Sequence, residues 1–173
     1  MGDSLASQAA LCDYPPAIST VAAARYACKM SGWALLHFDL HRILYIAAII
    51  FAGRTGGGQM ITEGFEAWDY GPILPTLYNH LRPFGNEKIN VDVFPDADRL
   101  GSNEYTRHLI EETCPKFKGV KSAELVALTQ LNDGAWSRNY RKGAGLVIPV
   151  GDMQDEYERY YKVQELAGPT RTI

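Results

Sequence analysis

The segment from Phe65 to Tyr78 constrains the fold more than any other stretch of the chain. It concentrates large aromatic rings, which supply much of the apolar area that a core of this size can bury; these are Phe65, Trp68 and Tyr70. Gly71-Pro72 interrupts regular structure, because proline disfavours the helical conformation of the residue before it. Pro75 fits the first position of a helix, where its missing N–H costs nothing. We therefore expect a short extended segment, a turn, and then a helix over residues 75–83.

A second feature is the apolar stretch over residues 38–53, which predicts the strongest helix of the chain. One helical face carries Leu40, Ile43, Leu44, Ala47 and Phe51, and Tyr45, Ile46, Ile49 and Ile50 widen it. Such a helix is expected to be central and buried. A membrane span is not expected, because the uninterrupted apolar run covers only residues 43–52, half of the roughly 20 residues that a bilayer requires.

The remaining pattern predicts a mainly α fold. Further helices are expected over residues 18–30, 102–113, 122–131 and 152–166, and residues 90–94 alternate as in a short strand or an extended crossing. In the last helix Tyr157 and Tyr160 are expected in the core and Tyr161 at the surface. We expect a single compact helical domain over residues 18–166, with at most a short strand pair around the FEAWDYGP segment. Residues 1–17 and 167–173 are expected to be tails.

Charge and cysteine content favour a cytoplasmic protein. The net charge of −3 and the pI near 5.8 provide no broad basic field for nucleic acid. Cys12, Cys28 and Cys114 are odd in number and form no CxxC pair, so they are expected to be reduced thiols. The first ten residues lack the positive start and apolar run of a signal peptide.

No group of residues has the pattern of an enzyme site. An enzyme requires a nucleophile with a base, paired carboxylates in a cleft, or a metal cluster. His37 and His41 come closest, because their spacing of four would place both on one helix face in metal-chelating geometry. No third ligand is evident, and Glu66 and Asp69 are better explained by strand and turn positions. We therefore expect no catalytic residue, no cofactor and no metal, and keep a small metal-dependent enzyme using the two histidines as an alternative.

A cluster of basic and aromatic residues is the best local candidate for a contact surface. It comprises Trp136, Arg138, Tyr140, Arg141 and Lys142. Tryptophan, tyrosine and arginine dominate the energetic hot spots of protein interfaces. Trp136 itself is better explained as a core residue. A nucleic-acid role is not favoured, because three cations on an acidic chain give a weak phosphate footprint.

These elements together resemble the Panacea antitoxin domain, the SocA-like family, from about residue 18 to residue 166. The resemblance rests on the segment 40–47, on Leu128-Thr129, and above all on a motif of aromatic, glycine and proline residues. That motif comprises Phe65, Glu66, Ala67, Trp68, Tyr70, Gly71, Pro72 and Pro75, with Trp136 further on. His41-Arg42 stand where a glutamine-lysine pair is expected, and Gln130 stands where the family often has histidine.

The resemblance implies an antitoxin of bacteria or their phages, in a setting of phage defence or of a prophage. Such a protein neutralises a cognate protein toxin, encoded nearby, by direct binding. One alternative is a proteolytic adaptor that delivers the toxin to a cytoplasmic protease. Under either mechanism, the candidate toxin-binding residues are Tyr70, Arg138, Tyr140, Arg141 and Lys142.

Overall fold

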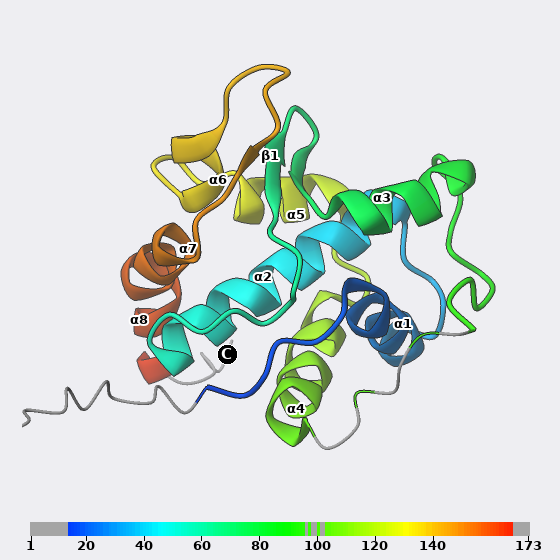
Figure 1. The fold of residues 1–173 in the computed structure, drawn as a ribbon, viewed down its shortest axis with the longest axis horizontal. Helices are drawn as coiled ribbons and strands as arrows, with labels where there is room; N and C mark the ends of the chain where they lie inside the picture. The colour runs from blue at the N-terminus through cyan, green and yellow to red at the C-terminus, as the bar shows by residue number, and fades with distance from the viewer. Residues whose placement is uncertain (1–13, 96, 98–99, 101–102, 168–173) are drawn as a thin grey trace, which may run out of the picture.

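Helix α2 (His37–Thr55) runs through the middle of the molecule, and the other elements pack around it (Figure 1). The architecture comes from a computed structural model, which describes residues 14–95, 97, 100 and 103–167. Every α2 residue from Asp39 to Ala52 is buried, as the sequence predicts. The helix ends at Gly56, which caps it in the left-handed conformation with φ 71°. Most of the two predicted tails lies outside the described residues.

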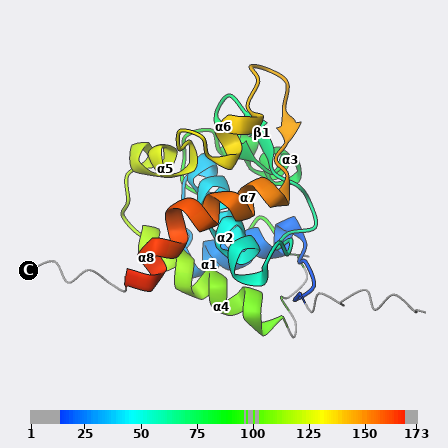
Figure 2. The same ribbon diagram turned by 90° about the vertical axis from the view of Figure 1, so that its left-hand side faces the viewer.

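The helices that surround α2 come from both halves of the chain (Figure 2). Those in contact with it are α1 (Thr20–Ser31), α3 (Pro75–Leu81), α4 (Glu104–Thr113), α5 (Ser122–Thr129) and α7 (Val150–Glu156). The short helix α6 (Ala135–Asn139) lies against α7 and β1 rather than against α2. The predicted mainly α fold is thus confirmed, with one apolar helix as its axis.

Local signals in the sequence account for where several helices begin. The Ser19 hydroxyl accepts a hydrogen bond from the backbone N–H of Ala22 and caps α1. Asn103 caps α4 in the same way through the N–H of Thr106. Pro75 occupies the first turn of α3, as predicted. Asp152 was expected to cap the last helix, but α7 begins earlier, after Pro149, and Asp152 lies in its first turn.

The last helix differs from its prediction because a π-helical turn interrupts it. The π turn (Tyr157–Tyr161) separates α7 from α8 (Lys162–Ala167). The turn packs against α2 at Gly53, where an added Cβ would lie 1.9 Å from Cγ of Tyr157. A π turn shifts the register of the residues that follow it. Tyr157 is buried as predicted, but the predictions for the other two tyrosines were wrong. Tyr160 is only partly buried and lies outside the core, whereas Tyr161 packs partly buried against it.

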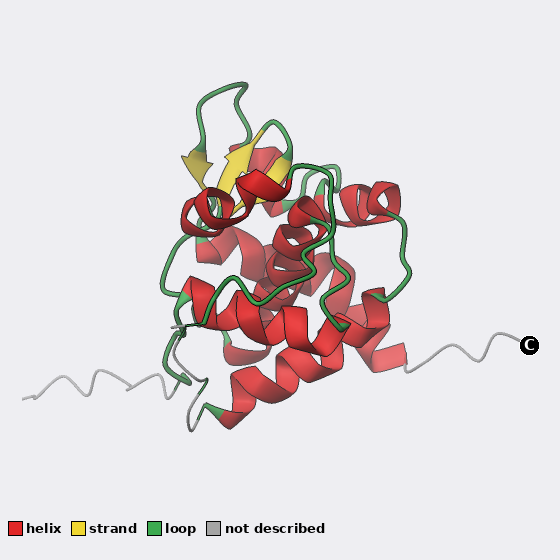
Figure 3. Ribbon diagram, turned by 90° about the vertical axis from the view of Figure 1, so that its right-hand side faces the viewer, coloured by secondary structure: helices red, strands yellow, loops and turns green. Residues whose placement is uncertain are grey.

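A small antiparallel sheet lies at one end of the helical body (Figure 3). Its strands are β1 (Glu66–Trp68), β2 (Gly71–Ile73) and β3 (Leu146–Val147), in the order β2-β1-β3. The β1–β2 hairpin is the strand pair expected around FEAWDYGP, with Trp68 opposite Gly71. Strand β3 was not predicted from the sequence. It is two residues long and both are exposed, so no alternation signals it.

The alternating segment Asn90–Phe94 does not form the strand that was considered for it. It runs as bends in a connection, and only its end is buried, through Phe94. The adjoining Ile89 donates its N–H to the carbonyl of Leu35, which fixes the crossing beside the start of α2. Among the described helices, none combines the length and the apolar character that crossing a bilayer requires.

Candidate protein-binding surface

The turn of the β1–β2 hairpin lies against the loop that follows α6. The Asp69 carboxylate accepts a hydrogen bond of 3.1 Å from the N–H of Gly143. On the inner side of the turn, Nη2 of Arg42 donates to the carbonyl of Tyr70 at 3.0 Å. The ring of Tyr70 lies 5.4 Å from that of Phe38 but remains 61% exposed. Two segments far apart in sequence thereby form one surface.

Trp136 links α6 to the sheet. Its indole Nε1 donates to the carbonyl of Trp68 at 3.1 Å, and its side chain is buried, as its sequence position predicted for a core residue. The ring of Tyr140 stacks on Trp136 at a centroid distance of 4.6 Å. Desolvation and the neighbouring Asp69 carboxylate raise the pKa of the Tyr140 phenol, which stays protonated at neutral pH. Tyr140 is therefore held in place as a partly buried edge of the surface.

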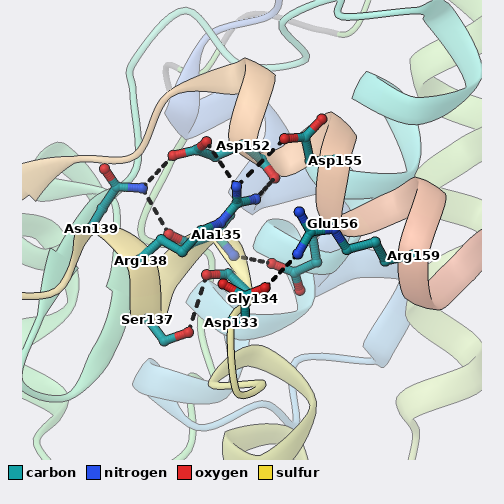
Figure 4. Close-up of polar contacts among 10 residues, drawn as sticks. All are labelled: Asp133, Gly134, Ala135, Ser137, Arg138, Asn139, Asp152, Asp155, Glu156 and Arg159. Carbon is teal, nitrogen blue, oxygen red and sulfur yellow. Dashed lines mark hydrogen bonds and ion pairs between the residues drawn. The ribbon is translucent and has the colours of Figure 1, made fainter.

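Arg138 points away from the loop and towards α7 (Figure 4). Its guanidinium lies 3.4 Å from the carboxylate of Asp152 and 3.5 Å from that of Asp155, and donates to the Asp152 carbonyl at 3.1 Å. Asn139 adds a hydrogen bond of 2.6 Å from its amide to the Asp152 carboxylate. These contacts hold α6 against α7 and so position Tyr140 and the residues that follow it.

The N-terminus of α6 rests on a buried carboxylate. Glu156 is 1% exposed, and its Oε2 accepts a hydrogen bond of 2.6 Å from the N–H of Ala135 (Figure 4). Desolvation raises the pKa of this carboxyl to about 7. Glu156 was not predicted as a site residue, although its position beside Met153 and Tyr157 on the buried stripe of the last helix could have marked it as a buried acid.

The two remaining candidates, Arg141 and Lys142, are exposed on the loop. Arg141 donates to the carbonyls of Tyr140 and Arg138, and neither cation takes part in an ion pair among the described residues. Of the predicted contact residues, the structure thus presents Tyr70, Arg141 and Lys142 to solvent and Tyr140 in part. Arg138 lies behind them as a support.

A hollow of about 410 Å³ opens between the hairpin and the loop. It is lined by Glu66, Trp68, Asp69, Tyr70 and residues 143–145. Its two carboxylates are bound to separate partners: Glu66 accepts a hydrogen bond from the Trp68 indole at 2.7 Å, and Asp69 accepts one from the N–H of Gly143. The hollow is shallow and has both polar and apolar lining residues, which suits the side chains of a protein partner.

The histidines considered as metal ligands lie elsewhere, at the buried start of α2. His41 uses Nδ1 to accept a hydrogen bond of 3.1 Å from the N–H of Leu74, and the ring of His37 stacks on Phe38. Desolvation lowers the pKa of His37 to about 4 and that of His41 well below its usual range, so both are neutral at pH 7. Across the part of the chain that the structure describes, no three His, Cys, Asp or Glu side chains gather as a metal site.

Comparison with known proteins gives one finding. The sequence model of a family described as "Antitoxin SocA-like, Panacea domain" matches residues 40–137, which is more than half of the 173 residues. The match begins within α2, at Leu40, and covers the hairpin, α3 to α5 and Trp136 of α6. The comparisons with curated proteins and with solved structures gave no significant match.

Proposed function

The chain belongs to the SocA-like Panacea antitoxin family, and from this premise we propose that it neutralises a cognate protein toxin by binding it directly. The observation that carries the proposal is the family match over α2 and the hairpin. The exposed aromatic and basic residues at the hairpin supply a surface for it. Binding of this kind inhibits by occlusion: a rigid surface covers the active site of the toxin or prevents a movement that the toxin requires.

We place the toxin contact on the surface formed by Tyr70, Tyr140, Arg141 and Lys142, with Arg138 as its support. The aromatic rings offer contact area at low cost in conformational entropy, and neither Arg141 nor Lys142 pairs with a carboxylate among the described residues. A stable pair would bury on the order of 1,200 to 2,000 Å² in total. The residues named here would form the centre of such an interface rather than its whole extent.

The test is co-expression of the chain with each neighbouring open reading frame, scored for growth and for co-purification. We expect one neighbour to be toxic alone, harmless with this chain, and recovered with it as a stoichiometric complex. Rescue without a stable complex, lost in a strain that lacks the responsible protease, would instead support delivery of the toxin by an adaptor. If no neighbour is toxic, the antitoxin proposal fails.

The contact surface is tested separately in the same assay. We expect Tyr70→Ala combined with Arg141→Ala and Lys142→Ala to weaken the complex by at least about tenfold, as expected when hot-spot side chains are truncated. The matched control is Lys118→Ala with Lys121→Ala, which removes two exposed cations from the loop before α5. Equal neutralisation by the two variants would place the interface on another face.

A further inference from the structure

Strand β3 forms the open edge of the sheet. On the opposite side, β2 is buried along its whole length, so it cannot accept a further strand. Figure 2 places β3, drawn in orange, at the outer margin of the molecule, and Leu146 and Val147 are 45% and 59% exposed. Of the two sheet edges that the structure describes, only the β3 edge is accessible.

The register shows which backbone groups this edge presents. In the β1–β3 ladder Ile148 donates its N–H to the carbonyl of Phe65, and Glu66 lies opposite Val147. Hydrogen-bonded and non-hydrogen-bonded pairs alternate along an antiparallel ladder. Val147 therefore turns its own N–H and C=O away from β1 and towards solvent. An extended peptide segment can form hydrogen bonds with this N–H and this C=O at the same time.

The strand is only two residues long, but apart from this shortness it carries none of the features that usually protect an exposed edge. Natural sheets blunt their edges with charged residues, prolines or bulges, or cover them with another element. Both β3 residues are large and apolar instead, and the first proline follows only at position 149. The edge thus combines unpaired backbone groups with an apolar surface.

The charged residues near β3 indicate what kind of segment would bind along this strand. Arg141 and Lys142 are exposed in the turn that leads into β3, and neither is in an ion pair among the described residues. A segment that lay along β3 with carboxylates at one end would place those carboxylates near the two cations. Electrostatic complementarity of this kind fixes register and partner choice more than raw affinity.

We propose that an extended segment of the toxin, apolar at alternate positions and acidic at one end, adds to β3 as the next strand of the sheet. This inference rests on the proposed function in identifying the partner as the toxin. The sheet order would become β2-β1-β3-partner. Main-chain hydrogen bonds to Val147 would supply affinity, and the apolar and acidic side chains would supply specificity.

The test selects peptides from a random phage-displayed library on the isolated chain, so it does not depend on finding a toxin. We expect enriched sequences with β-branched or aromatic residues at alternate positions and Asp or Glu at one end. Val147→Pro removes the outward N–H but no ladder bond, since edge prolines are tolerated where the N–H faces solvent. Its affinity for the selected peptides should fall at least about tenfold, whereas the control Val147→Thr should bind like the original chain.

Two further measurements keep the proposal falsifiable if Val147→Pro is misfolded, as judged by its thermal melt. Bound peptide should slow hydrogen exchange at the Val147 amide of the unaltered chain. Arg141→Glu with Lys142→Glu should weaken binding of the acidic peptides by about tenfold at low salt. The proposal is overturned if no peptide is enriched, if bound peptide leaves Val147 exchange unchanged, or if the edge is filled by a second copy. That last case would appear as a dimer that Val147→Pro abolishes.

Discussion

At the level of single residues, the Glu156 carboxyl makes stability depend on pH. Its pKa is about 7 in the folded chain and near 4.5 in the unfolded chain, because folding desolvates it. Between these values the folded state keeps a proton that the unfolded state releases. Stability must therefore fall as pH rises through this window and level off above about 7. We expect the contribution of Glu156 to the free energy of unfolding to fall by roughly 2 to 4 kcal/mol between pH 4.5 and 8.

The matched variant is Glu156→Gln, which keeps the shape and can still accept the hydrogen bond from Ala135. Urea unfolding of both proteins at several pH values isolates the contribution of the Glu156 carboxyl to the free energy of unfolding. Other titrating groups, including His37 and His41, act equally on the two proteins and cancel in the difference. A difference in free energy of unfolding that is constant from pH 4.5 to 8 would show that Glu156 ionises as an ordinary carboxyl in this site.

At the level of elements, Gly53 governs the contact between α2 and the π turn. Alanine normally stabilises a helix by up to about 1 kcal/mol relative to glycine. At Gly53 the added Cβ would lie 1.9 Å from the Tyr157 ring, so Gly53→Ala should instead destabilise the protein by about 1 to 3 kcal/mol or more. Gly151→Ala in α7 is the control, since nothing lies within 4 Å of its Cβ position. The packing is confirmed if the denaturant midpoint falls in Gly53→Ala and rises in Gly151→Ala relative to the unaltered protein. A neutral Gly53→Ala would contradict it.

Arg42 attaches the hairpin to α2. Its guanidinium bonds the Asp39 carboxylate at 3.1 Å and the Tyr70 carbonyl at 3.0 Å, and Asp39 in turn accepts a hydrogen bond from Ser122. Arg42→Met keeps much of the apolar stem but leaves Asp39 without its cation. We expect a loss of about 3 kcal/mol, as for breaking a buried pair, and faster hydrogen exchange in β2 than in α1. Uniform acceleration of both elements would show that Arg42 supports the whole fold and not the hairpin in particular.

The elements predicted best are those whose own residues carry the signal. The apolar period of α2 and the proline at the start of α3 locate both helices within two residues at each end. Strand β3 and the π turn escaped prediction, because their causes lie in other segments. Strand β3 is defined by its pairing with β1, and the π turn packs against Gly53. The same holds for the site: the sequence names Arg138, but only the fold shows that its partners are Asp152 and Asp155.

At the scale of the whole molecule, the buried helix α2 contacts most other elements, so the described domain should unfold as one cooperative unit. The reactivity of Cys28 on α1 and of Cys114 after α4 measures the opening of the core at two places. Both thiols are free and buried, and desolvation raises the pKa of each to about 12. Iodoacetamide should therefore reach them only when the core opens, because the reactive thiolate does not form in the folded state.

In a Cys12→Ser background, we expect Cys28 and Cys114 to be alkylated at the same rate, slower than an unfolded thiol by a factor of about 10³ or more. Mass spectrometry of proteolytic peptides should then show Cys28 and Cys114 labelled to the same extent at every time point. Faster labelling of Cys28 than of Cys114 would contradict the prediction. It would mean that α1 opens while α2 and α4 stay folded, so that the core around α2 consists of at least two units of different stability.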